Sequence, residues 1–161
     1  GEEGQVLEEN PGALVREVLP MVGPEARQAG VEIEADIEPS LPSVLADRIQ
    51  IQQVLLNLLR NAIEAIEAAG AARRVVRIAV KRIETGFVDV RVADSGPGLS
   101  EAVREHVFNP FFTTKPDGIG IGLALSRSIV DAHGGRLWAE PPGDGGATFR
   151  FTLPTVERDG D

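Results

Sequence analysis

The run from Asp47 to Ala69 contains neither glycine nor proline, and it constrains the fold more than any other part of the chain. Its apolar residues recur every three or four positions, which is the spacing of a helix with one buried face. These residues are Leu55, Leu58, Leu59, Ala62, Ile63 and Ile66. We predict a long amphipathic helix whose apolar face packs into a core.

The opposite side of this predicted helix carries a stripe of mostly uncharged polar residues. Its members are three or four positions apart and therefore stack on one face: Gln50, Gln53, Asn57, Asn61 and Glu64. An ordinary solvated face carries Lys, Glu or Arg, whereas Asn is a poor helix former. An amide oxygen can bind a hard cation such as Mg²⁺ without adding negative charge beside phosphates. From the helix alone, a solvated face and a ligand-binding face are both open.

A second helix is predicted to begin at Asn10 and Pro11, because asparagine caps free N–H groups and proline suits the first helical position. Gly30 is expected to end it. Within it, Pro20 and Pro24 each remove a backbone donor, so we expect a kinked or shortened helix.

Alternating apolar residues predict strands at 31–37, at 76–80 and at 88–92, the last two forming a hairpin. Two further strands are expected in RLWAE and ATFRFTL, with shorter helices near 101–107 and at 123–132. Because helices and hairpins interleave, we predict an α/β protein: a two-layer α/β sandwich in which helices cover one face of a mixed β-sheet.

Composition excludes several classes of protein. With 161 residues, 42% of them hydrophobic, the chain can form one domain with a real core. Its net charge of -9 disfavours nucleic acid as a partner. There is no cysteine, so disulfides and thiolate metal sites are excluded.

No apolar run could cross a bilayer, and the acidic start is unlike a signal peptide. We expect a soluble, monomeric, cytoplasmic fragment without membrane contact.

Two glycine-rich stretches are candidates for ligand binding. The sequence DSGPG (94–98) follows a predicted strand, where glycines let the backbone approach a flat ligand and Asp94 could accept a hydrogen bond from an exocyclic amine or simply start a turn. Gly118, Gly120 and Gly122 precede a helix, an arrangement in which free N–H groups hold phosphate. Neither stretch is a Walker loop or a dinucleotide fingerprint.

Five motifs in a fixed order carry a family resemblance: NLLRNAIEA, DSGPG, FNPFFTTK, DGIGIGLAL and GGATFRF. Together they resemble the histidine-kinase branch of the gyrase, Hsp90, histidine kinase and MutL superfamily, whose ATP-binding domains have the Bergerat fold. The stretch FFTTKPDGIGIGLALSRSIVDAHGG is also similar to oxygen- and nitrogen-responsive two-component kinases.

This resemblance implies roles for individual residues. It makes Asn61 the ligand of a Mg²⁺ that bridges the phosphates of ATP, and it makes Asn57 a support for metal or phosphates. It places Asp94 against the adenine amine. The other implied ATP-binding residues are Gly96 and Gly98 in the pocket, Gly118, Gly120, Gly122 and Leu123 at the phosphates, and Thr148 through water.

The resemblance also implies a lid over the nucleotide, from about 109 to 118. Lys115 lies in this segment and could reach the terminal phosphate as a catalytic group, although a solvated lysine is nearly as plausible. For Phe108, Phe111 and Phe112, core packing is favoured over ligand contact. For His106 and His133, a structural role is favoured over a catalytic one.

Two features depart from the family pattern. Many members carry a basic residue where this chain has Glu64, so the phosphate charge must be met by Mg²⁺, backbone amides, Lys115 or Arg60. No His-Glu phosphoacceptor motif is present either. We therefore divide the chain into 1–9, a linker from an upstream histidine domain, 10–155, the catalytic ATP-binding domain, and 156–161, a tail.

The expected activity is transfer of the γ-phosphate of ATP to a histidine on a separate dimerisation domain of the same kinase, which serves a response regulator indirectly. A gyrase- or Hsp90-like ATPase is disfavoured, because the residue one turn before Asn61 is Asn57, which cannot act as a general base. FNPFFTTK weakens an anti-sigma serine-kinase interpretation. The remaining alternative is a nucleotide-binding interaction module without transfer activity.

Overall fold

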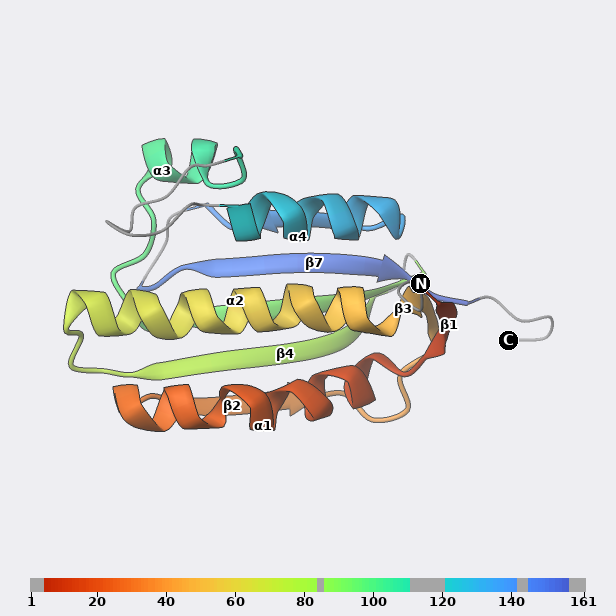
Figure 1. The fold of residues 1–161 in the computed structure, drawn as a ribbon, viewed down its shortest axis with the longest axis horizontal. Coiled ribbons are helices and arrows are strands. Elements are labelled where there is room, and N and C mark those ends of the chain that lie inside the picture. The colour runs from red at the N-terminus through yellow and green to blue at the C-terminus, as the bar shows by residue number, and fades with distance from the viewer. Residues whose placement is uncertain (1–4, 84–85, 111–120, 142–144, 157–161) are drawn as a thin grey trace.

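The computed structural model describes residues 5–83, 86–110, 121–141 and 145–156, without the side chains of 121 and 122 (Figure 1). The elements follow in the order β1 (Val6–Glu9), α1 (Pro11–Ala29), β2 (Glu32–Ile37), β3 (Val44–Asp47), α2 (Arg48–Ala69), β4 (Val75–Ile83), β5 (Phe87–Asp94), α3 (Glu101–His106), α4 (Ile121–Ala132), β6 (Arg136–Ala139) and β7 (Thr148–Pro154).

Five strands form the main sheet in the order β2-β4-β5-β7-β6. β2 and β4 are parallel, whereas the other neighbouring pairs are antiparallel, so the sheet is mixed. Figure 1 shows α1, α2 and α4 side by side across one face of it. The prediction of a two-layer α/β sandwich with helices on one face is therefore confirmed.

The core lies between α2 and the middle of the sheet. The apolar positions of α2 predicted from the sequence are all buried, as are the valines that β4 and β5 direct toward the helices: Val76, Val80, Val88, Val90 and Val92. α2 lies between α1 and α4 (Figure 1). One side of its polar stripe therefore faces α4, and this position sets up the site described below.

The other face of the sheet carries charged side chains. Asp89 alternates with the buried valines of β5, yet it is only 4% exposed because Arg150 covers it, with Nε 3.1 Å from Oδ1. Arg150 also donates to Glu140 and lies over the ring of Trp138. This network gives the uncovered face a polar surface that needs no second layer of helices.

α1 begins and ends where the sequence predicts. The Oδ1 atom of Asn10 accepts from the N–H of Ala13, and Gly30 ends the helix in the left-handed region at φ 67°. Of the two expected effects of the prolines, shortening is excluded, since α1 continues past both Pro20 and Pro24, and a kink stays a prediction. Its apolar face, fully buried at Val18 and Val22, stabilises the helix through packing.

Two short strands were missed from the sequence. Residues Val6–Glu9, assigned above to a linker, form β1 and pair antiparallel with β3, with Val6 opposite Asp47. The ordered unit thus includes residues before Asn10, and the division into linker and domain stays a prediction. In the part of the chain that the structure describes, no helix combines the length and hydrophobicity needed to cross a membrane.

Candidate functional site

Asp94 ends β5, and backbone groups from two segments fix its carboxylate. Oδ1 accepts from the N–H of Gly96 at 2.9 Å and from the N–H of Ala147 at 3.3 Å. The N–H of Asp94 in turn donates to the carbonyl of Ala147 at 2.9 Å. Because both side-chain bonds end on Oδ1, Oδ2 is the oxygen suited to accept from a ligand.

Burial raises the pKa of Asp94 above its ordinary value of 3.8, while the N–H groups of Gly96 and Ala147 act in the opposite direction. A carboxylate held in a partly desolvated place costs stability, and such groups concentrate at functional sites. The site therefore has an acceptor that is fixed in position and only partly solvated.

Glycines line this strand end because two backbone segments approach one another closely there. A Cβ added to Gly146 would overlap the carbonyl oxygen of Asp94, and one added to Gly98 would lie 2.9 Å from the carbonyl oxygen of Gly145. Gly98 also has φ 81°, which other residues rarely adopt. Backbone, rather than side chains, therefore forms this wall of the site.

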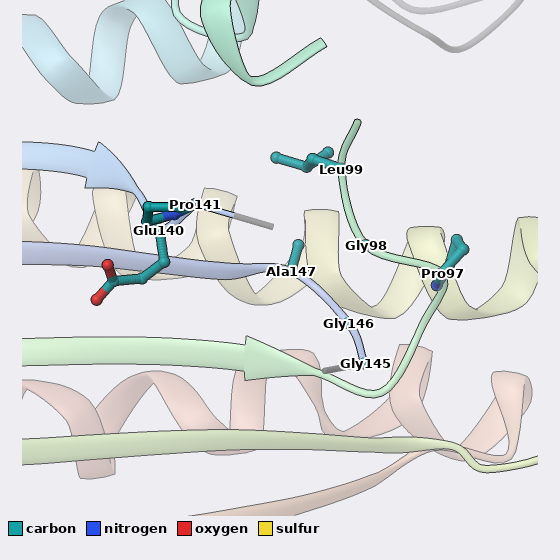
Figure 2. A pocket seen from close by; sticks show the side chains of 8 residues that line it. All are labelled: Pro97, Gly98, Leu99, Glu140, Pro141, Gly145, Gly146 and Ala147. Atoms are coloured by element: carbon teal, nitrogen blue, oxygen red, sulfur yellow. The ribbon is translucent and has the colours of Figure 1, made fainter. Parts of the chain in front are cut away.

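A small hollow lies between the 97–99 segment and the 145–147 segment (Figure 2), and Ala147, which lines it, donates to Asp94. Leu99, Ala147, Glu140 and Pro141 contribute side chains to it. Its volume is about 60 Å³. Ligand pockets usually measure roughly 300–1,000 Å³, so these residues would enclose only part of a nucleotide-sized ligand.

Asn57 and Asn61 are half-buried on the α4 side of α2, whereas Gln50, Gln53 and Glu64 are exposed. The Nδ2 atom of Asn57 donates to the Oγ atom of Ser126 on α4 at 3.2 Å. Ser126 is completely buried. The two asparagines thus occupy the partly covered centre of the polar stripe, as a ligand-binding face requires.

Arg60, one of the predicted sources of positive charge, faces another direction. Its Nε atom lies 3.0 Å from Oε1 of Glu25 on α1, on the opposite side of α2 from α4. The hypothesis that Arg60 meets phosphate charge is therefore not supported by its position.

The structure describes only some of the remaining predicted site residues. Thr148 pairs with Ala93 next to Asp94, Leu123 packs against the core from the first turn of α4, and Gly122 lies in the same turn. Lys115, Gly118 and Gly120 lie outside the described residues, as do Phe111, Phe112 and most of the predicted lid.

Phe108 packs as the sequence favoured. Its ring meets that of Phe149 edge-on, with centroids 6.0 Å apart, and the guanidinium of Arg127 lies 5.4 Å from its centroid. Phe149 is itself buried in the core. Phe108 therefore fixes the chain to the sheet just before the segment predicted to be a lid.

His133 has two structural hydrogen bonds. Its Nε2 atom accepts from the N–H of Asp47 at 3.1 Å, and Nδ1 lies 2.8 Å from the carbonyl oxygen of Ile129. Since an N–H can only donate, Nε2 carries no proton and Nδ1 donates to Ile129. These two hydrogen bonds support the structural role that the sequence favoured for His133. In the exposed His106, the Nδ1 atom lies 3.1 Å from the side-chain Nδ2 atom of Asn109.

Sequence reasoning missed Ser126, Gly146 and Ala147 as parts of the site. The sequence does contain a clue to Ser126. It is a polar residue on the apolar face of α4, beside Ile129 and Val130, and this position indicates that its hydroxyl is buried. Gly146 and Ala147 belong to the GGATFRF motif, but their contact with Asp94 joins positions far apart in the chain.

Among the described residues, no group of three or more His, Cys, Asp or Glu side chains could hold a metal ion. On its half-buried side, α2 presents the uncharged amide oxygens of Asn57 and Asn61 as candidate metal ligands. Such a set suits Mg²⁺, which is usually held by one or two protein oxygens together with waters and substrate phosphates.

A helix-covered mixed sheet, with a fixed carboxylate at one strand end and amides on the adjacent helix, defines a class of nucleotide-binding domain. Residues 46–157 match the family described as "Histidine kinase-, DNA gyrase B-, and HSP90-like ATPase". The chain belongs to this family of ATP-binding domains.

Within that family, the chain is similar to sensor histidine kinases. It is 48% identical to the sensor protein FixL of Bradyrhizobium diazoefficiens over 132 residues, which cover 82% of this chain and 26% of FixL. The solved catalytic domain of histidine kinase ThkA has a TM-score of 0.82 and 35% identity, with 94% of this chain and 97% of that one covered. Full-length ShkA in complex with AMPPNP has a TM-score of 0.83 and 32% identity, with 97% and 32% covered. The chain thus spans about a quarter of FixL.

Proposed function

We propose that this domain binds ATP with Mg²⁺ and donates the γ-phosphate to a histidine on a separate dimerisation domain, as the cytoplasmic catalytic part of a two-component kinase. The observation that carries the proposal is the pairing of a backbone-fixed Asp94 with a half-buried Asn57–Asn61 face on the neighbouring helix. Similarity to sensor histidine kinases supports the same activity.

In this proposal Asp94 selects the base. Oδ1 is held by two backbone N–H groups, so Oδ2 accepts from the exocyclic amine of adenine. Gly96 and Gly98 leave room for the flat ring, and Thr148 reaches it through water. GTP carries an oxygen in place of that amine, so a carboxylate at this point disfavours it.

Asn61 would hold Mg²⁺ through its amide oxygen, with Asn57 beside it. When bound, the ion neutralises negative charge on the phosphates and orients them. Gly118, Gly120 and Gly122 offer backbone N–H groups to the phosphates, and Lys115, in the proposed lid, approaches the γ-phosphate. These assignments extend the family's pattern to the matching positions of this chain.

Transfer then requires positioning and charge neutralisation more than covalent chemistry by the domain. The acceptor imidazole supplies its own nucleophilic nitrogen, which forms the N–P bond as the bond from the γ-phosphorus to the bridging oxygen breaks and ADP leaves. An ATPase would also need a base to activate water. Asn57 cannot provide one, and this favours transfer over hydrolysis.

The test supplies this chain and radiolabelled ATP to a separately produced histidine domain of a sensor kinase. We expect label on the partner's histidine in the presence of Mg²⁺. Asn61→Ala should reduce the rate by about tenfold or more while circular dichroism stays unchanged, because a metal ligand is lost from a polar face. Gln53→Ala, at an exposed position of the same stripe, is the matched control.

The other outcomes separate the alternatives. Free phosphate without labelled partner would indicate an ATPase, and nucleotide binding without turnover would indicate an interaction module. Normal transfer by Asn61→Ala with unchanged Mg²⁺ dependence would overturn the metal assignment. A loss of helicity in that variant would instead assign Asn61 a structural role.

A further inference from the structure

The hydrogen bond between Asn57 and Ser126 joins two elements that the proposed function uses separately. Asn57 stands one turn before Asn61 on α2, whereas Ser126 lies on α4, whose first turn contains Gly122, one of the glycines proposed to bind phosphate. The Nδ2 to Oγ distance is 3.2 Å, and Ser126 is fully buried. This contact is therefore shielded from water on the α4 side.

The orientation of an asparagine amide matters at a metal site. Its oxygen can bind a cation, whereas its NH₂ group presents two donors that a cation repels. A serine within a helix commonly donates its proton to the carbonyl one turn earlier, so its oxygen acts as acceptor toward neighbouring helices. Such an acceptor beside Asn57 holds the nitrogen end toward α4 and turns the oxygen end away from it.

We propose that Ser126 is a positioning residue of the kinase site, and that its buried hydroxyl fixes the amide of Asn57 with the oxygen directed to the Mg²⁺ and phosphate side. None of the roles that the family resemblance implies falls on this side chain. The inference rests on the proposed function, because it uses Asn57 and Asn61 as the metal-side residues. It adds that α4 controls the metal site through one hydrogen bond.

The role predicts a specific defect. Without the hydroxyl, the amide of Asn57 can rotate and present its nitrogen to the metal side, which weakens the coupling between Mg²⁺ and nucleotide but leaves the adenine end untouched. One hydrogen bond corresponds to about a three- to tenfold effect on an equilibrium. Binding of nucleotide without Mg²⁺ should then be unchanged.

The experiment measures the dissociation constant of a fluorescent, non-hydrolysable ATP analogue with this chain, first with a chelator and then with saturating Mg²⁺. We expect Ser126→Ala to reduce the Mg²⁺-dependent gain in affinity about three- to tenfold. Ser128→Ala, at an exposed position of the same helix, is the matched control and should keep the full gain. Melting curves verify that both variants are folded.

A double-mutant cycle separates positioning from a general effect on packing. If Ser126 acts through Asn57, Ser126→Ala should cause no further loss in an Asn57→Ala background. A full Mg²⁺-dependent gain in Ser126→Ala, an equal loss in Ser128→Ala, or an undiminished effect in the Asn57→Ala background would each overturn the inference. Asn61→Ala tests the proposed metal site independently, so a normal gain in that variant would overturn the metal assignment of the proposed function rather than the role of Ser126 alone.

Discussion

At the scale of single residues, Asp94 combines a binding role with a cost in stability. Its carboxylate is oriented by backbone N–H groups from Gly96 and Ala147, so the strand end is shaped before any ligand arrives. Preorganised acceptors of this kind lower the entropy lost on binding. Both consequences of this arrangement can be tested with one substitution.

Asp94→Asn should weaken ATP binding by roughly ten- to hundredfold, because a charged hydrogen bond to the base is replaced by an amide whose NH₂ group faces another donor. Discrimination against GTP should fall as well, since the oxygen of guanine can accept from that NH₂ group. Isothermal titration with both nucleotides measures each effect. An unchanged ATP isotherm would remove Asp94 from the base-binding site.

The same variant should be more stable than the wild type near neutral pH. Burial raises the pKa of Asp94 above 3.8, so the folded state binds more protons than the unfolded state between 3.8 and the raised value. Stability due to this group therefore falls as the pH rises through that window, and asparagine removes the loss. Urea unfolding from about pH 7 down to about pH 4 should show the advantage shrinking as the pH falls. An advantage independent of pH would exclude burial of charge as its cause.

The role of a residue could be predicted from the sequence where the pattern that reveals it lies within one segment. The polar stripe of α2 follows from helical spacing alone, and the half-buried positions of Asn57 and Asn61 agree with it. Contacts across the chain could not be predicted in this way. The bonds from Asn57 to Ser126 and from Ala147 to Asp94 depend on which helices and strands become neighbours.

At the scale of elements, the junction of β5 and β7 depends on close backbone contact. Gly146→Ala would place a methyl group on the carbonyl oxygen of Asp94, and only a shift of the backbone could relieve the overlap. We expect a loss of about 1–3 kcal/mol in the free energy of unfolding, together with weaker nucleotide binding. Chemical denaturation and nucleotide titration measure the two effects.

Gly23→Ala is the control for that substitution. Gly23 lies inside α1, and a Cβ there would meet mainly the flexible end of Arg27, at 3.2 Å. Alanine should stabilise the helix by about 0.5–1 kcal/mol without affecting nucleotide binding. If Gly146→Ala behaved like Gly23→Ala, the close contact at the strand junction would be contradicted.

His133 joins the end of α4 to the start of α2. His133→Ala would remove the acceptor for the N–H of Asp47, a residue only 4% exposed that also caps α2 by accepting from Gln50. An unsatisfied buried donor costs about 1–3 kcal/mol, so the denaturation midpoint should fall by a corresponding amount. His106→Ala, at an exposed site, should change stability by less than about 0.5 kcal/mol. Equal effects of the two substitutions would show that the Asp47 contact contributes little.

Long, periodic elements were predictable, whereas short paired strands were not. The apolar faces of α2 and of the β4–β5 hairpin are local patterns, and the sequence places them correctly. β1 and β3 have four residues each. β1 is exposed over most of its length and so shows no buried face, whereas in β3 the exposed Leu45 lies between the buried Val44 and Ala46, an alternation too short to predict a strand. Their pairing joins 6–9 to 44–47, a contact that no local pattern specifies.

At the scale of the whole molecule, the candidate site and the junction of β1 with β3 lie at opposite ends of the sheet (Figure 1). Asp94, the start of β7 and the first turn of α4 are at one end. The start of α2, the end of α4 and β1 are at the other. Because α2 runs the length between these ends, ligand binding at one end can be compared with an internal reference at the other.

Amide hydrogen exchange with and without a non-hydrolysable ATP analogue and saturating Mg²⁺ makes that comparison. We expect greater protection at 94–99, at 145–148 and in the first turn of α4, because nucleotide would cover backbone at the strand end and draw on the N–H groups that begin the helix. The proposed lid at 109–118 should gain protection as well, since a loop closing over phosphate acquires contacts that it lacks without ligand. The β1–β3 pair and the hairpin at 76–92 should change little. A uniform gain over the whole chain would indicate general stabilisation by binding rather than a local site, and no gain at 94–99 would place the nucleotide elsewhere.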